Sequence, residues 1–206
     1  MKEEEVIALS NLCNFKADNV SPLKQEASGR KYWRVSNTSD SFVLCYLDPS
    51  IGNHLDFIQI TNSLQNNNIN SVNVIYHNDE HGLTLQEDLG DKDLLSILNT
   101  ENKTELIEKS LDLLIQIQNA DIKNIDRFTD NELTDQMYLF KNIFLKNFLN
   151  IEMNSSIDDL ISITMSNLKK HPWLNCHFDY ERRNLILNEH QSITAIDYQD
   201  MKKGPI

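Results

Sequence analysis

The chain has 206 residues, enough to bury a sizeable core in one domain or two small lobes. Its 40% apolar and 24% charged residues are typical of a globular protein, and its formal charge of −12 argues against sequence-independent binding of nucleic acid, which needs clustered Lys and Arg. The acidic start MKEEEV lacks the positive region of a secretory signal, and no apolar run reaches membrane-spanning length, so we expect a cytoplasmic protein without nucleic-acid or membrane partners.

Residues 1–86 predict a small sheet with one long helix. After a short N-terminal helix, KYWRVS and FVLCYL flank the polar turn NTSDS, which is a hairpin signal. Residues 53–65 predict a helix because Phe57, Ile60 and Leu64 fall on one face. SVNVIY and GLTLQ, separated by HNDEH, predict two further strands, so we expect this part to form an N-terminal lobe.

Residues 92–206 predict a helical C-terminal lobe, joined to the first by EDLGD, residues 87–91, where Gly90 suits a hinge. Thr129 and Glu132 have the spacing of a capping box, ahead of an apolar stripe formed by Leu133, Met137, Phe140, Phe144 and Phe148. Further helices are predicted after Ser156 and around the apolar positions Ile107, Leu111 and Leu114.

The stretch HFDYERRN, residues 177–184, precedes two short apolar runs that predict a hairpin, LILN and ITAI, joined by NEHQS. Pairing these runs would bring Asp197 close to Asn184, and their oxygens suit magnesium (Mg2+). Asp179 would then be left to accept a proton from an attacking hydroxyl group. Two unit charges about 4 Å apart repel by about 4 kcal/mol at an effective dielectric near 20, so a polyphosphate beside Asp179 and Asp197 would need that cation.

HFDYERRN followed by IDYQD resembles the catalytic loop and metal-binding strand end of the aminoglycoside phosphotransferase and choline kinase family. Three stretches, SGRKYWRV, QEDLGD and IDYQDMKKGPI, look closer to the anomeric amino-sugar kinases of cell-wall recycling, which act on N-acetylmuramate and N-acetylglucosamine. The resemblance covers roughly residues 23–206. It implies an α+β, two-lobed protein-kinase-like fold with a small β-rich N-lobe and a helical C-lobe.

The resemblance also implies roles for individual residues. Asp179 corresponds to the catalytic base, Asn184 and Asp197 to the magnesium ligands, and His177 to a histidine that braces the loop. Glu87, Asp88 and Leu89 correspond to the hinge whose backbone meets the adenine of ATP. The implied activity is transfer of the γ-phosphoryl group of ATP to a hydroxyl group of a small, sugar-like molecule.

The sequence departs from the family pattern at three points. Cys45 stands where a strand lysine is expected, the helix over 53–65 has no glutamate, and there is no G-x-G-x-x-G loop. Arg30, Lys31 and Arg34 are the candidates to supply the missing positive charge. Family members continue beyond the GPI stretch with helices that build the acceptor pocket, so we expect an incomplete C-lobe and little sugar turnover by these 206 residues.

Simpler interpretations apply to single residues. Asp179 and Asn184 each favour turns, but together with Asp197 they indicate a site. Arg183, like Arg182, would either contact phosphate or pair with Glu181, and Asp200 would either hold the loop or approach the substrate.

HNDEH is most simply a solvated turn, and the three cysteines, odd in number and widely spaced, indicate neither disulfides nor zinc.

Two alternative functions stay open beside the amino-sugar kinase. The missing lysine favours a degenerate, non-catalytic nucleotide-binding module, whereas the acidic charge is compatible with a phosphotransferase for cationic aminoglycosides. The sequence leaves the acceptor, the preferred nucleotide and the oligomeric state open.

Overall fold

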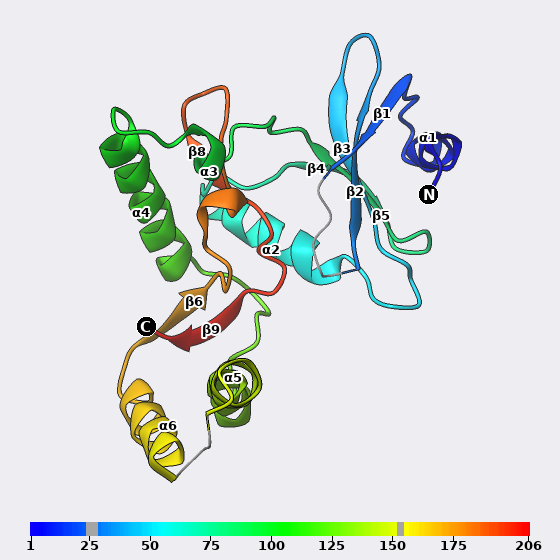
Figure 1. Cartoon of the computed structure of the whole chain (residues 1–206). Coiled ribbons are helices and arrows are strands. Elements are labelled where there is room, and N and C mark those ends of the chain that lie inside the picture. The colour runs from blue at the N-terminus through cyan, green and yellow to red at the C-terminus, as the bar shows by residue number, and fades with distance from the viewer. Residues whose placement is uncertain (24–28, 152–154) are drawn as a thin grey trace. The chain divides into compact units, whose positions relative to one another are not determined.

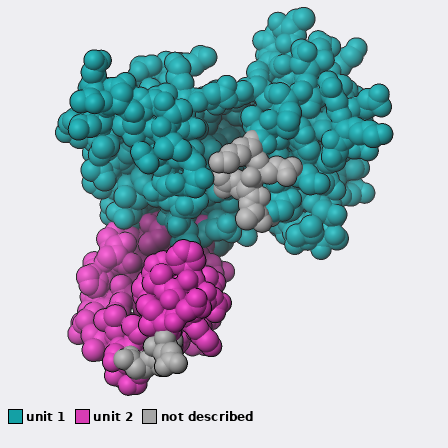
Figure 2. All heavy atoms as spheres, viewed as in Figure 1, with its two compact units in different colours: residues 1–124, 177–200 teal, residues 125–176, 201–206 magenta. Residues whose placement is uncertain are grey.

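The computed structural model of the chain describes residues 1–23, 29–151 and 155–206. By its internal contacts the chain divides into two compact units (Figure 2). Unit 1 contains Met1–Asn124 and His177–Asp200, and unit 2 contains Ile125–Cys176 and Met201–Ile206. The predicted lobe boundary at residues 87–91 stays a prediction. The stretch SGRKYWRV begins at Ser28, which lies outside the described residues.

The first part of unit 1 is a five-stranded antiparallel sheet with the strand order β1-β2-β3-β5-β4 (Figure 1). The predicted hairpin is formed by β2 and β3, whose register runs from Lys31 opposite Tyr46 to Ser36 opposite Ser41. The strands are β1 (Asn19–Pro22), β2 (Lys31–Ser36), β3 (Ser41–Tyr46), β4 (Val74–Asn78) and β5 (Leu83–Glu87).

The two faces of this sheet have different partners because side chains alternate along each strand. One face buries Trp33, Val35, Leu44, Leu83 and Leu85 in a core completed by residues of the helix α1 (Glu3–Leu12) and the segment that follows it. The opposite face carries the intervening residues of β2, β3 and β5, including side chains that line the cavity described below. The strand pattern therefore separates a structural face from a face available for binding.

Among the described residues, the helices of the N-terminal part of unit 1 are α1, α2 (Leu55–Asn66), α3 (Leu94–Ile97) and α4 (Lys103–Asn119). On α2, Phe57, Ile60 and Leu64 are buried as predicted. The predicted face of α4 is wrong, because Ile107 and Leu111 are exposed and the helix buries Leu106, Leu113 and Ile117 instead. Helical periodicity identifies an apolar stripe, but two adjacent stripes compete on α4.

The returning segment of unit 1 begins with His177 and contains the 3-10 helix η2 (Arg182–Asn184), β7 (Leu185–Leu187) and β8 (Ile193–Ala195). β7 and β8 form the predicted antiparallel hairpin, with Leu185 opposite Ala195. The Leu187 amide also donates to the Lys92 carbonyl at 2.9 Å, so the hairpin is attached to the segment that follows β5.

The described residues of unit 2 form three helical segments and one strand pair. The helix α5 (Asp130–Leu139) continues as the π-helix η1 (Phe140–Phe148), and α6 (Ser155–Leu168) follows. The predicted capping box is present, since the Glu132 amide donates to Thr129 Oγ1 at 3.2 Å and the Thr129 amide donates to Glu132 Oε2 at 2.8 Å. β6 (Trp173–Cys176) pairs with β9 (Lys202–Pro205), an antiparallel pairing that the sequence did not predict.

Within the described ranges, no helix combines the length and the apolar character needed to cross a membrane.

Candidate active site

The loop that follows His177 is held in place by contacts at both of its ends. His177 is 2% exposed, and its Nε2 donates to the Ile196 carbonyl at 3.0 Å if Nδ1 accepts the 3.4 Å contact from the Asp179 amide. Burial lowers the pKa of His177, in agreement with this neutral tautomer. Tyr180 extends from the loop to α4, where its hydroxyl donates to the Ser110 carbonyl at 2.5 Å. The loop therefore has a defined conformation around Asp179.

Asn184 connects the end of this loop to Asp179. Its Nδ2 donates to the Asp179 carbonyl and to Asp179 Oδ2, each at 3.0 Å. No donor from the described residues contacts Asp179 Oδ1, and the Asp179 side chain is exposed. One carboxylate oxygen is thus committed to Asn184, and the other is available for a further partner.

The hairpin brings Asp197 beside Asn184, as its two predicted strands imply. The Ile196 amide donates to the Asn184 carbonyl at 2.9 Å, directly before Asp197 in the sequence. Asp197 has φ +61°, and Phe178, directly before Asp179, has φ +78°. Non-glycine residues adopt this region at a cost of roughly 1 kcal/mol, and such strain is concentrated at functional sites.

Tyr198 attaches the Asp197 segment to α2. Its side chain is completely buried, its ring stacks on Phe57 at 5.3 Å, and its hydroxyl lies 2.7 Å from Thr61 Oγ1. Burial raises the pKa of Tyr198 to about 12. The sequence IDYQD carries no signal for this role of Tyr198, because only the folded chain shows that α2 covers it.

A cavity of about 420 Å³ lies in unit 1, between the open face of the sheet and the returning segment. Its wall contains predicted site residues from three parts of the sequence: Arg34 from β2; Glu87, Asp88 and Leu89 from residues 87–91 at the end of β5, called the linker below; and Arg183, Asn184 and Asp197 from the returning segment. Tyr32, Val43 and Gln86 complete the sheet side. Residues as far apart in the sequence as Arg34 and Asp197 therefore share one cavity.

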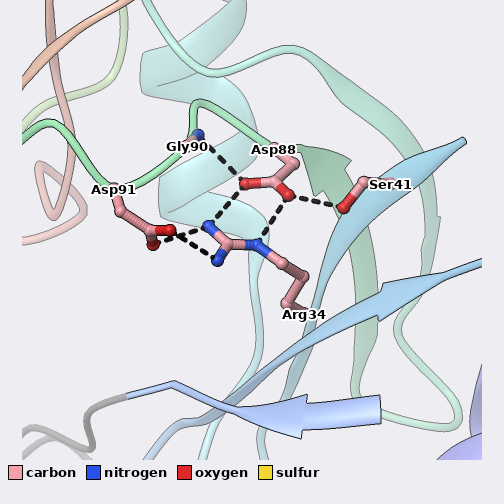
Figure 3. A network of polar contacts seen from close by, with 5 residues as sticks. All are labelled: Arg34, Ser41, Asp88, Gly90 and Asp91. Carbon is pink, nitrogen blue, oxygen red and sulfur yellow. Dashed lines mark hydrogen bonds and ion pairs between the residues drawn. The ribbon is translucent and has the colours of Figure 1, made fainter. Parts of the chain in front are cut away.

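The cavity wall is predominantly acidic. Among the residues that the structure describes, it contains two arginines and five carboxylates, the latter from Glu87, Asp88, Asp91, Asp93 and Asp197. Arg183 Nε donates to Glu181 Oε1 at 2.7 Å, and Arg34 is paired with Asp88 and Asp91 (Figure 3). Both arginines are thus already neutralised by carboxylates, and a polyphosphate placed here would need a cation from solution.

The remaining predicted residues do not line this cavity. Arg30, Lys31, His177, Asp179 and Asp200 are absent from its wall. Lys31 lies in β2 opposite Tyr46, and Asp200 Oδ2 is 3.5 Å from Gln199 Nε2. Among the described residues, neither Arg30 nor Lys31 has a side-chain hydrogen bond or an ion pair with Asn184 or Asp197.

Cys45, at the position where a lysine was expected, lies in β3 between Tyr32 and Thr84. It is 1% exposed, and burial raises the pKa of its thiol to about 12, so the thiol stays protonated and uncharged at neutral pH.

The side chains of Asn184 and Asp197 fit a magnesium ion. Asn184 uses Nδ2 on Asp179 and leaves its amide oxygen, while Asp197 accepts from Gln199 Nε2 at 2.7 Å through Oδ1 and leaves Oδ2. In the part of the chain that the structure describes, no group of three or more His, Cys, Asp or Glu could hold a metal ion. Two oxygen ligands are sufficient for magnesium, which binds proteins through one or two side-chain oxygens and completes its shell with phosphates and water.

The sequence profile of the phosphotransferase enzyme family matches residues 19–206. An N-acetylmuramate/N-acetylglucosamine kinase of Pseudomonas putida is 24% identical over 196 residues, which are 92% of this chain. The chain spans 57% of the length of that relative.

Solved structures share the fold. A spectinomycin phosphotransferase in complex with ADP and spectinomycin has a TM-score of 0.71 at 15% identity, covering 100% of this chain and 71% of its own. A choline kinase from Streptococcus pneumoniae has a TM-score of 0.69 at 14% identity, covering 99% of this chain and 71% of its own. These matches confirm the predicted α+β, protein-kinase-like fold.

Proposed function

Because the chain belongs to the phosphotransferase enzyme family, we propose that it transfers the γ-phosphoryl group of ATP to a hydroxyl group of a small molecule. The observation that carries the proposal is the contact of Asn184 with Asp179, together with the shared cavity that joins Asn184, Asp197 and the linker Glu87–Leu89. A base, two metal-ligand candidates and a nucleotide-sized cavity are the components that this reaction needs.

Asp179 would act as the general base. Asn184 holds its Oδ2, so Oδ1 is the oxygen that would take the proton of the acceptor hydroxyl. The acceptor oxygen then forms a bond to the γ-phosphorus while the bond between that phosphorus and the β–γ bridging oxygen breaks, leaving ADP. General-base assistance of this kind contributes about a hundred- to ten-thousand-fold in rate.

Asn184 and Asp197 would hold magnesium, which when bound supplies positive charge to the phosphates and orients them. His177 keeps these residues in register, because it contacts the Asp179 amide on one side and the Ile196 carbonyl on the other. Glu87–Leu89 would receive the adenine. Arg183 and Asp200 stay candidate supporting residues beside the metal ligands.

An amino sugar is the acceptor class that we propose, by analogy with the Pseudomonas putida kinase. A second candidate, a nucleotide-binding module without activity, is favoured by one observation. The buried, protonated Cys45 cannot provide the charge that a strand lysine would give to the phosphates. An aminoglycoside acceptor is the third candidate, because such acceptors are cationic and the chain carries a formal charge of −12.

The proposal is tested by calorimetric titration of ATP into the chain with and without magnesium. We expect magnesium-dependent binding that is lost in Asp197→Ala and kept in Asp179→Ala, since Asp179 is assigned to the acceptor and not to the metal. Binding that survives unchanged in Asp197→Ala would contradict the metal assignment.

Turnover separates the two main candidates. ADP release should be measured with N-acetylmuramate, N-acetylglucosamine and an aminoglycoside, using Asp179→Ala as the control. Sugar-dependent release that falls by about a hundredfold or more in Asp179→Ala supports the kinase. Nucleotide binding without release on any acceptor, in a version extended at the C-terminus as well as in this chain, supports the non-catalytic module.

A further inference from the structure

Arg34 joins strand β2 to the linker that follows β5. Its Nε donates to Asp88 Oδ2 at 2.7 Å and its Nη2 donates to Asp88 Oδ1 at 2.9 Å, which is a forked, two-bond contact (Figure 3). The same guanidinium contacts Asp91, with Nη1 3.0 Å from Oδ2 and Nη2 2.9 Å from Oδ1. One side chain therefore binds two residues of the linker, Asp88 and Asp91, which lie 54 and 57 positions further along the chain.

Asp88 is the centre of this network. Besides Arg34, its carboxylate accepts from Ser41 Oγ at 2.5 Å and from the Gly90 amide at 3.0 Å. Its side chain is 11% exposed. Burial alone would raise the pKa of Asp88, but the hydrogen bonds from Arg34, Ser41 and Gly90 outweigh burial and lower it. Asp88 is thus nearly buried and ionised, and its carboxylate accepts four hydrogen bonds.

Leu89 lies between Asp88 and Asp91, and its backbone is open to hydrogen bonding. In the described part of the chain, neither its amide nor its carbonyl takes part in a hydrogen bond, although both neighbours belong to the network. Leu89 lines the cavity, and Gly90 has φ +80°, a conformation that glycine adopts without strain. A fixed linker with one unused backbone donor and one unused backbone acceptor can form hydrogen bonds with the polar edge of a flat heterocycle.

The charge balance argues against Arg34 as a simple phosphate ligand. One guanidinium faces two carboxylates, so the trio carries a formal charge of −1 and does not attract an anion. The sequence-based expectation that Arg34 replaces the missing lysine charge therefore has an alternative.

We propose that Arg34 and Asp88 are positioning residues that clasp the linker, so that the backbone of Leu89 is presented to the base of a bound nucleotide. The inference rests on the proposed function for the identity of the ligand. It assigns Arg34 and Asp88 to base recognition and leaves the phosphates to magnesium.

The first experiment examines the ligand-free protein by amide hydrogen exchange. In Arg34→Ala, exchange across residues 87–91, and at the Gly90 amide above all, should accelerate by about tenfold or more, because this amide bonds to a carboxylate that has lost its main partner. The control is Lys123→Ala, which removes the same charge from an exposed ion pair with Asp121. Unchanged exchange in Arg34→Ala would overturn the clasp, whether or not the protein binds nucleotide.

The second experiment compares adenosine with ADP and magnesium by calorimetry. If Arg34 positions the base, Arg34→Ala should weaken both ligands by the same factor, about ten- to a hundredfold. A loss confined to ADP would mean that Arg34 acts on the phosphates, and would overturn the proposal. Arg34→Lys should recover only part of the affinity, equally for both ligands, because lysine keeps the charge without the fork.

Failure of the proposed function can be distinguished from failure of the clasp. A wild-type chain that binds neither adenosine nor ADP would overturn the proposed function and the role in base recognition with it. The exchange experiment would still decide whether Arg34 orders the linker.

Discussion

One substitution, Asn184→Asp, would replace the hydrogen bond from Asn184 to Asp179 with a repulsive contact. In the wild type, Nδ2 lies 3.0 Å from Asp179 Oδ2 and donates to it. The variant replaces this donor with a carboxylate oxygen, so two acidic groups would meet at the same distance. Asn184 is 3% exposed, which limits how far the new side chain can turn away.

The magnitude follows from the 3.0 Å separation. Two unit negative charges at that distance repel by about 5.5 kcal/mol at an effective dielectric near 20 and by about 1.4 kcal/mol in bulk water. Because Asp179 is exposed, solvent screens part of this repulsion, and we take about 3 kcal/mol as the expected destabilisation at pH 7. This corresponds to a pKa about 2 units higher for one acid of the pair.

The sign of the pH dependence follows from that rise. A carboxyl group whose pKa is raised by folding destabilises the folded state only when it is ionised. This destabilisation is nearly absent below the pKa of the unfolded chain and grows until the pH has passed the pKa of the folded chain. The penalty of Asn184→Asp should therefore be small near pH 4 and reach its full size at neutral pH.

Urea unfolding from pH 4 to 7 measures this penalty, with Asn184→Leu as the matched control. The control removes the same hydrogen bonds, which costs about 1–3 kcal/mol, without adding a charge. If Asn184→Asp is as stable as Asn184→Leu at pH 7, or if their difference does not change with pH, the two side chains are not adjacent and the reasoning about the base is refuted.

Three further predictions concern stability. Tyr198→Phe should lower the free energy of unfolding by about 1 kcal/mol in urea, because it removes the buried hydroxyl that lies 2.7 Å from Thr61 Oγ1; an unchanged midpoint would contradict that bond. Gly82→Ala should cost at least about 2 kcal/mol, since Gly82 has φ +62° and an added Cβ would lie 1.9 Å from the Leu47 carbonyl oxygen; thermal unfolding at neutral pH measures this. The lowered pKa of Asp88 contributes stability above its ordinary value of 3.8 that is lost as the pH falls through the folded value, so the melting temperature of Asp88→Asn should vary less than that of the wild type in acid.

Local patterns were sufficient for several elements. The capping box at Thr129 and the hairpin of residues 185–195 are both short-range features, in which a few neighbouring residues determine the geometry. The hairpin also accounts for the proximity of Asp197 to Asn184, because antiparallel pairing brings the end of one strand back to the start of the other.

Long-range partners were not predictable. The sequence indicated Arg34 as a positive charge, but its pairing with Asp88 and Asp91 depends on how β2 and the end of β5 lie in the folded sheet. Likewise, β9 contains Lys, Gly and Pro and has little strand propensity, so its pairing with β6 is determined by tertiary context. The role of Tyr198 required the position of α2.

Unit 1 is discontinuous in sequence, and this determines the order in which its parts can assemble during synthesis. The sheet and α4 leave the ribosome first, and residues 177–200 follow only after the chain has produced residues 125–176. At about 5–20 residues per second, residues 125–200 take roughly 4 to 15 seconds to translate. During that interval the side of the nascent sheet that carries Tyr32 and Gln86 lacks the wall supplied by Asn184 and Asp197. We expect chaperones to engage the growing chain at this surface.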